Sequence, residues 1–388
     1  MGNSAETDRI ETDLRRQLAS AQRIVVKVGS QALCLPDGRL DGRTIAGLCQ
    51  DLSALLDQGR QVVLVSSGAV ASGRGEIGQG PDGSYRGLGK QALAAIGQPL
   101  LMARYRLELK GLGREVAQVL LTHADLSDRS RFLHARRVMG ELMTAGVLPI
   151  VNENDTVAVD ELKFGDNDQL AAQVAHVIGA DALVLLTEVE GLYSAHPGKD
   201  PNAKLISYVG ARDQQALEAA EDGTSAFGTG GMRSKVLAAR KAGAVGVVTA
   251  IARGKRDQAL LAVLRGESIG TVLAPAQRKL AGKRSWVATS VRTRGSLHVD
   301  AGAAEALQRG GRSLLPAGVL RVEGRFEVGD PVQICGPEGR LIARGLVRYA
   351  SDDAQRACGL RTEQIAAVLG WLPADELVHR DDLALADA

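Results

Sequence analysis

The sequence has few of the residues from which metal cages, disulfide frameworks and base-stacking surfaces are built. Its four cysteines lie far apart and form no CxxC pair, and its six histidines form no HxxxH or HExxH arrangement. This pattern disfavours a zinc hydrolase and a disulfide framework, and it favours free thiols in a reducing compartment. Aromatic residues make up only 3% of the chain, which argues against base stacking as the main activity.

The sequence also lacks a long apolar run and a strong net charge. No stretch approaches the roughly 18 apolar residues of a membrane span. Acidic residues occupy the N-terminal region where a signal peptide needs basic ones. The net charge of +2 points to neither a polyanion nor a membrane surface as the partner. We therefore expect a cytoplasmic protein without a membrane partner.

What the chain has instead is a regular alternation of short apolar runs and longer helical patterns. The predicted strands are continuous apolar runs, which is typical of a parallel sheet covered on both faces. Strands are predicted at residues 24–30, 61–67, 116–122, 147–155, 182–188 and 244–250, and helices at 44–58, 129–145, 169–178 and 231–242. This order predicts an α/β domain over residues 21–282, a three-layer αβα sandwich with a mainly parallel central sheet.

The pattern changes after residue 282. From 284 to 371 the segments are short, glycine-punctuated and mostly strand-like, with one helix at 301–309. Such spacing predicts a small β-barrel domain. The first 20 residues predict a polar, partly helical extension, and residues 372–388 a short acidic tail. Two domains with two short terminal segments fit the length of 388 residues.

Two of the predicted strands end in residues that are suited to binding an anion. Lys27 lies near the end of the first strand and is followed by Gly29, at the sheet edge where open α/β sheets bind ligands. A solvated strand end is the simpler alternative for this lysine. Ser67 and Gly68 follow the second strand and precede a helix, whose free N–H groups attract anions. A serine that only caps the helix fits the same pattern.

Two further clusters carry polar residues at the ends of strands or helices. Residues 151–170 place Asn152, Asp155, Asn167 and Asp168 on either side of one loop. This composition fits a site for an amine and a cation, and it also fits an ordinary turn. Residues 227–235 form a glycine-rich loop that enters a helix, an arrangement suited to phosphate, although it is neither a Walker A nor a GxGxxG sequence. Together the clusters favour a phosphate-transfer site.

Six motifs, taken in order, resemble those of the bacterial glutamate 5-kinase family, which belongs to the amino-acid kinases. They are IVVKVGS, VSSGAVASGR, VNENDTVA, KFGDNDQL, LLTEVEGLYSAHP and GTGGMRSK. The resemblance covers most of the chain and includes a C-terminal PUA domain. It implies the amino-acid kinase fold and transfer of the ATP γ-phosphate, with Mg2+, to the side-chain carboxylate of glutamate. The product would be glutamyl 5-phosphate, and the reaction would be the first step of proline biosynthesis.

The resemblance also implies roles for individual residues. Lys27 and Lys235 would neutralise the transferring phosphoryl group, and Asp168 would hold their ammonium groups in place. Glutamate would bind to Ser67, Gly68, Asp155 and Asn167. ATP would contact Lys27, Gly29, Thr187, Glu188, Thr229, Gly230, Gly231, Met232, Arg233, Ser234 and Lys235. No residue of the chain is assigned as a metal ligand.

The chemistry of this reaction agrees with the residues that the sequence offers. Phosphoryl transfer depends on alignment and charge stabilisation and needs no covalent catalyst. A glutamate carboxylate is already ionised at pH 7, so the reaction needs no general base. As partners, the resemblance implies a second copy of the chain in a homo-oligomer, proline as a feedback inhibitor, and a downstream glutamyl-phosphate reductase.

Three alternatives remain open. PUA domains resemble modules of RNA-modifying enzymes, but residues 284–371 hold twelve arginines against nine acidic residues, a net charge of +3. That is weak for an RNA-binding surface, so a structural or regulatory barrel is preferred. A degenerate kinase acting as a metabolite sensor is disfavoured by the intact Lys27, Asp168 and Lys235. An acetylglutamate kinase shares several of the motifs and would be separated by offering both substrates.

Overall fold

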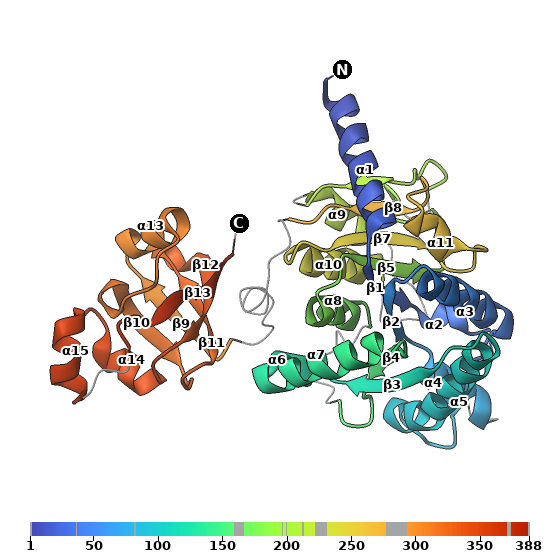
Figure 1. Cartoon of the computed structure of the whole chain (residues 1–388), viewed down its shortest axis with the longest axis horizontal. Helices are drawn as coiled ribbons and strands as arrows, with labels where there is room; N and C mark the ends of the chain where they lie inside the picture. Colours follow the sequence, from blue (N-terminus) through green and yellow to red (C-terminus); the bar gives the residue numbers. More distant parts are fainter. Residues whose placement is uncertain are drawn as a thin grey trace. The chain divides into compact units, whose positions relative to one another are not determined.

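The computed structural model divides the chain into two compact units, residues 1–278 and 279–388 (Figure 1). It describes the chain except for residues 1, 36, 81–82, 159–166, 196, 199, 212, 222–230, 277–292, 371–373 and 387–388. The boundary that the sequence analysis placed at 282–284 lies outside the described residues. In the part that is described, no helix is both long and apolar enough to cross a membrane.

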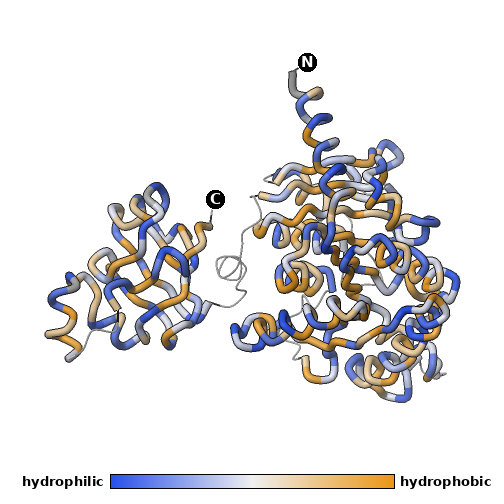
Figure 2. Tube along the Cα trace, in the orientation of Figure 1, coloured by the Kyte–Doolittle hydropathy of each residue, from blue (hydrophilic) through white to orange (hydrophobic). Residues whose placement is uncertain are grey.

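The first unit is built on one eight-stranded sheet with the order β3-β4-β2-β1-β5-β7-β8-β6. Its strands are β1 Arg23–Val28, β2 Gln61–Ser66, β3 Val116–Leu121, β4 Leu148–Glu153, β5 Ala182–Thr187, β6 Tyr208–Val209, β7 Val248–Arg253 and β8 Thr271–Leu273. All neighbours pair in parallel except β7 and β8. Apolar residues run along the central strands (Figure 2), because both faces of the sheet are covered.

Helices cover both faces of this sheet (Figure 1). They are α1 Gly2–Ser20, α2 Ser30–Leu33, α3 Gly42–Asp57, α4 Ala69–Ile77, α5 Lys90–Gly111, α6 His123–Ser127, α7 Arg129–Thr144, α8 Asn167–Ile178, α9 Gln215–Glu221, α10 Met232–Gly243 and α11 Ala259–Leu264. On one face, α3, α5 and α11 share a core with Val26 and Val28 of β1. On the other face, α8 packs against β1 and α10. The predicted αβα sandwich with a mainly parallel sheet is confirmed.

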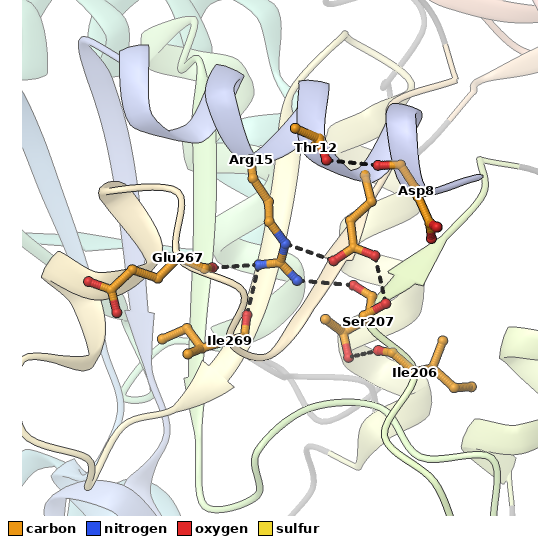
Figure 3. Close-up of polar contacts among 9 residues, drawn as sticks. Asp8, Thr12, Arg15, Ile206, Ser207, Glu267 and Ile269 are labelled. Carbon is orange, nitrogen blue, oxygen red and sulfur yellow. Dashed lines mark hydrogen bonds and ion pairs between the residues drawn. The ribbon is translucent and has the colours of Figure 1, made fainter. Parts of the chain in front are cut away.

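Helix α1, predicted as a polar, partly helical extension, packs against this unit through its C-terminal part. Helix α1 buries Leu14 and Leu18 in the core, and Arg15 is only 7% exposed. Figure 3 shows the Arg15 guanidinium donating to the carbonyl oxygens of Glu267 at 2.8 Å and Ile269 at 3.0 Å. The helix docks because Leu14 and Leu18 bury apolar surface and Arg15 donates to backbone carbonyl groups of the unit.

One predicted strand begins later than expected. The sequence predicted a strand over residues 244–250, whereas β7 starts at Val248. Residues 244–246 form a turn after α10, in which Gly246 adopts a left-handed φ of 83°. Val245 and Val247 are buried in this turn, and their apolar character extended the predicted strand beyond its real start.

The second unit is a five-stranded sheet with helices packed on its core. Its strands are β9 Gly295–Val299, β10 Val319–Gly324, β11 Pro331–Cys335, β12 Leu341–Val347 and β13 Val378–Leu385, in the order β10-β9-β11-β12-β13. All neighbours are antiparallel except β9 and β11. Helix α13 (Ala301–Gly310) matches the predicted helix at 301–309. A separate hydrophobic core fills this unit.

Two features of this unit differ from the sequence analysis. Residues 378–385, placed there in an acidic tail, form β13 and pair with β12. Acidic residues in a short terminal segment predict an exposed tail, but Asp382 is buried and pairs with Arg348 at 3.8 Å. Two helices, α14 (Ser351–Ala357) and α15 (Thr362–Leu369), were also missed. Acidic residues open α14, which favours its helix dipole.

Candidate active site

Four neighbouring strands bring the polar motifs of the sequence to one edge of the sheet. The strand order β4-β2-β1-β5 is parallel throughout, so the four carboxyl ends lie side by side. The residues that follow these ends are Asp155 after β4, Ser67 and Gly68 after β2, Gly29 after β1, and Glu188 after β5. Open α/β sheets bind ligands at this edge. These residues are far apart along the chain, and the parallel sheet makes them neighbours.

The most distinctive feature of this edge is a buried aspartate between two buried lysines. Lys27 Nζ lies 2.5 Å from Asp168 Oδ1, and Lys235 Nζ lies 3.0 Å from Asp168 Oδ2. The three residues are 3%, 0% and 5% exposed for Lys27, Asp168 and Lys235. A buried charge is costly unless it is paired, so the carboxylate fixes both ammonium groups. The two ammonium groups and the one carboxylate give the triad a net charge of +1, which suits an anionic ligand.

Local structure explains why these three side chains meet. Val26 and Val28 point into the core on the α3 face, so Lys27 between them points to the opposite face, where α8 packs. Asp168 lies in the first turn of α8, where a carboxylate is favoured by the helix dipole. Lys235 lies in the first turns of α10, which packs against α8. Gln169 Nε2 also donates to the Ser234 carbonyl at 3.3 Å and joins the two helices.

Asn167 is held beside this triad by three acceptors. Its Nδ2 donates to the Ser66 carbonyl at 3.1 Å, to Ser67 Oγ at 2.9 Å and to Asn152 Oδ1 at 2.9 Å. The Asn167 Oδ1 atom is buried and has no hydrogen-bond partner among the described residues. A buried acceptor without a donor is unusual in a folded protein and marks a place for a ligand donor.

Gly68 and Asp155 complete the predicted amino-acid side of the edge. Gly68 has a left-handed φ of 108° and stands at the N-cap of α4, where no side chain caps the helix. A glycine suits this φ because a side chain would be strained there. Asp155 lies in the turn directly after β4, and burial raises the pKa of its carboxyl group. Among the described residues, no side-chain hydrogen bond joins Asp155 to Asn167.

The residues predicted to bind ATP lie at the ends of β1, β5 and α10. Gly29 donates its N–H to the Leu186 carbonyl at 3.3 Å, next to Thr187 at the end of β5. Glu188 is exposed, and the Gln31 amide nitrogen, turned toward it, lies 2.8 and 3.1 Å from its oxygens. Gly231 is the N-cap of α10 and leaves its first N–H groups without a side-chain cap.

The remaining predicted ATP contacts fall into two groups. The first turn of α10 contains Met232, Arg233 and Ser234, which precede Lys235. Thr229 and Gly230 lie outside the described residues. The predicted site therefore has its described members at one sheet edge and at the starts of the two helices that pack behind it.

Two residues of this region were not assigned by the sequence analysis. Asn152, at 3% exposure, accepts from Asn167, and its own Nδ2 donates to Gln98 Oε1 at 2.8 Å. Gln98 lies in α5, far from every motif in the sequence. Asn152 was recognised as part of the polar loop without a role, whereas no pattern in the sequence marks Gln98.

Comparisons with known proteins identify the family. The amino acid kinase family matches residues 22–252, and the PUA domain matches residues 295–369. A glutamate 5-kinase of Trichlorobacter lovleyi is 47% identical over 96% of this chain and 98% of its own length. Those of Pelobacter propionicus and Myxococcus xanthus are 45% and 47% identical, also over 96% of this chain, and are covered to 100% and 98%. The chain belongs to the amino acid kinase family and, within it, to the glutamate 5-kinases, which confirms the resemblance.

Proposed function

We propose that this protein transfers the γ-phosphoryl group of ATP to the side-chain carboxylate of glutamate. An oxygen of the carboxylate forms a bond to the γ-phosphorus, the bond to the β-phosphate oxygen breaks, and ADP leaves with that oxygen. The product is glutamyl 5-phosphate. The observation that carries the proposal is the buried Lys27–Asp168–Lys235 triad beside Asn167, at the carboxyl edge of the sheet.

The triad supplies the charge that phosphoryl transfer needs. Negative charge spreads over the oxygens of the transferring group and the leaving phosphate, and preorganised cations stabilise it. Lys27 and Lys235 are held by one carboxylate, so their ammonium groups are positioned before the substrates bind. Their burial removes competing water and strengthens their attraction for the phosphoryl oxygens. No general base takes part, because the acceptor is already an anion.

The amino-acid side of the site recognises the α-ammonium and α-carboxylate groups. Asn167 Oδ1 is a buried acceptor and suits an ammonium donor, as does the Asp155 carboxylate. The Ser67 hydroxyl already accepts from Asn167 Nδ2 and has its proton available for the α-carboxylate. The uncapped start of α4 after Gly68 adds backbone N–H groups that favour an anion.

ATP would bind along the other side of the edge, with Mg2+ on its phosphates. Lys27, Gly29, Thr187 and Glu188 line the strand ends, and the start of α10 from Gly231 offers N–H groups to a phosphate. In the described part of the chain, no three His, Cys, Asp or Glu side chains form a metal cluster. Mg2+ would take its ligands mainly from phosphate and water. When bound, it would neutralise phosphate charge.

An acyl-phosphate assay tests the proposed function. Hydroxylamine traps acyl phosphates as hydroxamates, so the purified protein is incubated with ATP, Mg2+ and a panel of acidic amino acids. We expect hydroxamate with glutamate and none with aspartate or N-acetylglutamate. Product with N-acetylglutamate instead of glutamate would support the acetylglutamate kinase alternative. A protein that yields no product with any member of the panel would not be this enzyme.

The two subsites are separated by their effects on the Michaelis constants. Asp155→Ala and Asn167→Ala should raise KM for glutamate more than KM for ATP, because they remove contacts present in both ground and transition states. A rise confined to the ATP constant would mean that the two subsites are exchanged.

We further propose that this reaction is the first step of proline biosynthesis in the cytoplasm. We also propose that proline inhibits the enzyme by feedback. Proline has the α-carboxylate and cationic amine of glutamate but no side-chain carboxylate to accept a phosphoryl group. It would therefore occupy the amino-acid subsite as a dead-end ligand. Initial velocities against glutamate at several proline concentrations should converge at one maximal velocity. Inhibition that is indifferent to glutamate would argue for a separate proline site. A homo-oligomer and a reductase partner stay predictions.

A further inference from the structure

Four carboxamide side chains from four different elements form a continuous hydrogen-bonded chain that ends at the site. Asn167 of α8 donates to Asn152 of β4 at 2.9 Å, and Asn152 donates to Gln98 of α5 at 2.8 Å. Gln98 in turn donates to Gln118 Oε1 of β3 at 3.0 Å. A carboxamide has a donor and an acceptor end, so the orientation of each member constrains the next.

Backbone groups fix the direction of this chain at its inner end. Asn152 Oδ1 also accepts the Glu153 backbone N–H at 2.9 Å, and an N–H can only donate. The atom of Asn152 that faces Asn167 is therefore its oxygen, and the atom that faces Gln98 is its nitrogen. The Ser66 carbonyl, which can only accept, likewise fixes Asn167 Nδ2. Asn167 must then turn its buried Oδ1, which has no partner in the described part of the chain, away from these groups.

Close packing of two helices fixes the place of Gln98. Helices α4 and α5 meet at Gly73 and Gly97, where a Cβ atom would lie only 1.9 Å from the Leu93 carbonyl oxygen and 1.8 Å from that of Ala69. Any side chain at these positions would force the helices apart. Gln98 follows Gly97 directly, so its distance from the Ser67–Gly68 turn before α4 is set by this contact.

We infer that Gln98 is a positioning residue for the amino-acid subsite, which holds through Asn152 the Asn167 oxygen that receives the substrate ammonium group. The inference rests on the proposed function. Gln98 does not touch the substrate itself. Gln98 Oε1 accepts a hydrogen bond from Asn152 Nδ2. Asn152 is only 3% exposed, so water has little access to replace Gln98 as the acceptor.

Loss of this acceptor should weaken ammonium recognition specifically. Without it, Asn152 Nδ2 is left buried and unsatisfied, which is costly enough that the side chain should rotate in search of a partner. Rotation removes one of the three acceptors of Asn167 Nδ2. Only the Ser66 carbonyl and the Ser67 hydroxyl would then hold this amide, so Asn167 Oδ1 is positioned less firmly for the ammonium group. ATP meets other residues, so its binding should not change.

Three variants of the full chain test the inference. Gln98→Met keeps the length of the side chain but removes the strong acceptor, and it should raise KM for glutamate about 10-fold with KM for ATP unchanged. Gln98→Glu keeps acceptor oxygens for Asn152, and Gln118 can turn its amide to donate, so this variant should retain nearly the wild-type constants. Gln118→Ala removes the other, exposed bond of Gln98 and is the matched control with wild-type kinetics.

A ligand without the ammonium group separates positioning from general damage. Glutarate, which lacks the α-amino group, should inhibit wild type and Gln98→Met with the same inhibition constant. Three results would overturn the inference. Gln98→Met could weaken the binding of glutarate as much as that of glutamate, or raise KM for ATP as much as KM for glutamate. Gln98→Glu could also be as impaired as Gln98→Met. Gln98→Ala replaces Gln98→Met if that variant is insoluble. If the wild type is active and Gln98→Met has an unchanged KM for glutamate, only the inference is refuted. An inactive wild type refutes the proposed function as well.

Discussion

Neutralising Asp168 is the most direct test of the charge arrangement in the site. Asp168→Asn keeps the shape of the side chain but leaves two buried ammonium groups, previously 2.5 and 3.0 Å from the carboxylate, without their shared anion. Removing one partner of a buried ion pair costs about 3–5 kcal/mol of the free energy of unfolding. Because the lysines also lose their fixed positions, we expect kcat to fall by a factor of about 10²–10³.

The variant should also respond to anions in a characteristic way. With the carboxylate neutral, the two lysines repel each other, and a bound sulfate should relieve this repulsion and raise the melting temperature. Thermal unfolding with increasing sulfate should therefore stabilise Asp168→Asn more than wild type. The control is Asp51→Asn, which changes another buried aspartate whose carboxylate accepts backbone N–H groups of α11, away from the site. It should keep kcat and show no extra response to sulfate.

Three results would refute this reasoning. A full kcat in Asp168→Asn would remove the triad from the mechanism. Equal stabilisation of both proteins by sulfate would show that the lysines are not held together by charge. A fall in kcat for Asp51→Asn as large as for Asp168→Asn would mean that any buried aspartate of the unit supports activity through the fold alone.

Further predictions concern other charged residues of the first unit. Replacing Lys27 or Lys235 by alanine should lower kcat about 10²–10³-fold, and near-wild-type turnover in steady-state assays would exclude that lysine from the mechanism. Burial raises the pKa of Asp51 to about 6, so the native state binds more protons than the unfolded one between about pH 4 and 6, and stability should decline as pH rises through this range. Asp51→Asn should lose that component of the pH dependence in chemical denaturation, and an unchanged profile would contradict the assignment. Arg15→Met should lower the free energy of unfolding by about 1–3 kcal/mol, because the Ile269 carbonyl loses the Arg15 donor and the Glu267 carbonyl keeps only the Ile269 N–H. Arg16→Met, with a side chain 75% exposed, should be neutral.

The sequence predicted the αβα fold of the first unit, and the resemblance to the glutamate 5-kinases selected the three residues of the charged triad. Continuous apolar runs identified the strands because a parallel sheet buries both faces of each strand. Lys27 near a strand end and Asp168 near a helix start also fitted simpler structural interpretations, and the resemblance supplied their roles. Features that depend on a few neighbouring residues can be predicted from the sequence.

Terminal segments and turns were predicted less well, because their fate depends on contacts far along the chain. Helix α1 packs through carbonyl groups more than 250 residues away from Arg15. Strand β13 contains Asp382, whose burial is compensated by Arg348. A charged residue in a short segment predicts an exposed tail unless its partner is known, and the partner is a property of the tertiary structure.

The orientation of the carboxamides was decided only by the tertiary structure. The resemblance predicted that Asn167 belongs to the amino-acid subsite, but the sequence does not say whether it presents its oxygen or its nitrogen. That choice follows from the Ser66 carbonyl and from Asn152, which is fixed by the Glu153 N–H and by Gln98, 54 residues away in another helix. A hydrogen bond has a direction, and its direction is set by the atoms that the fold places around it.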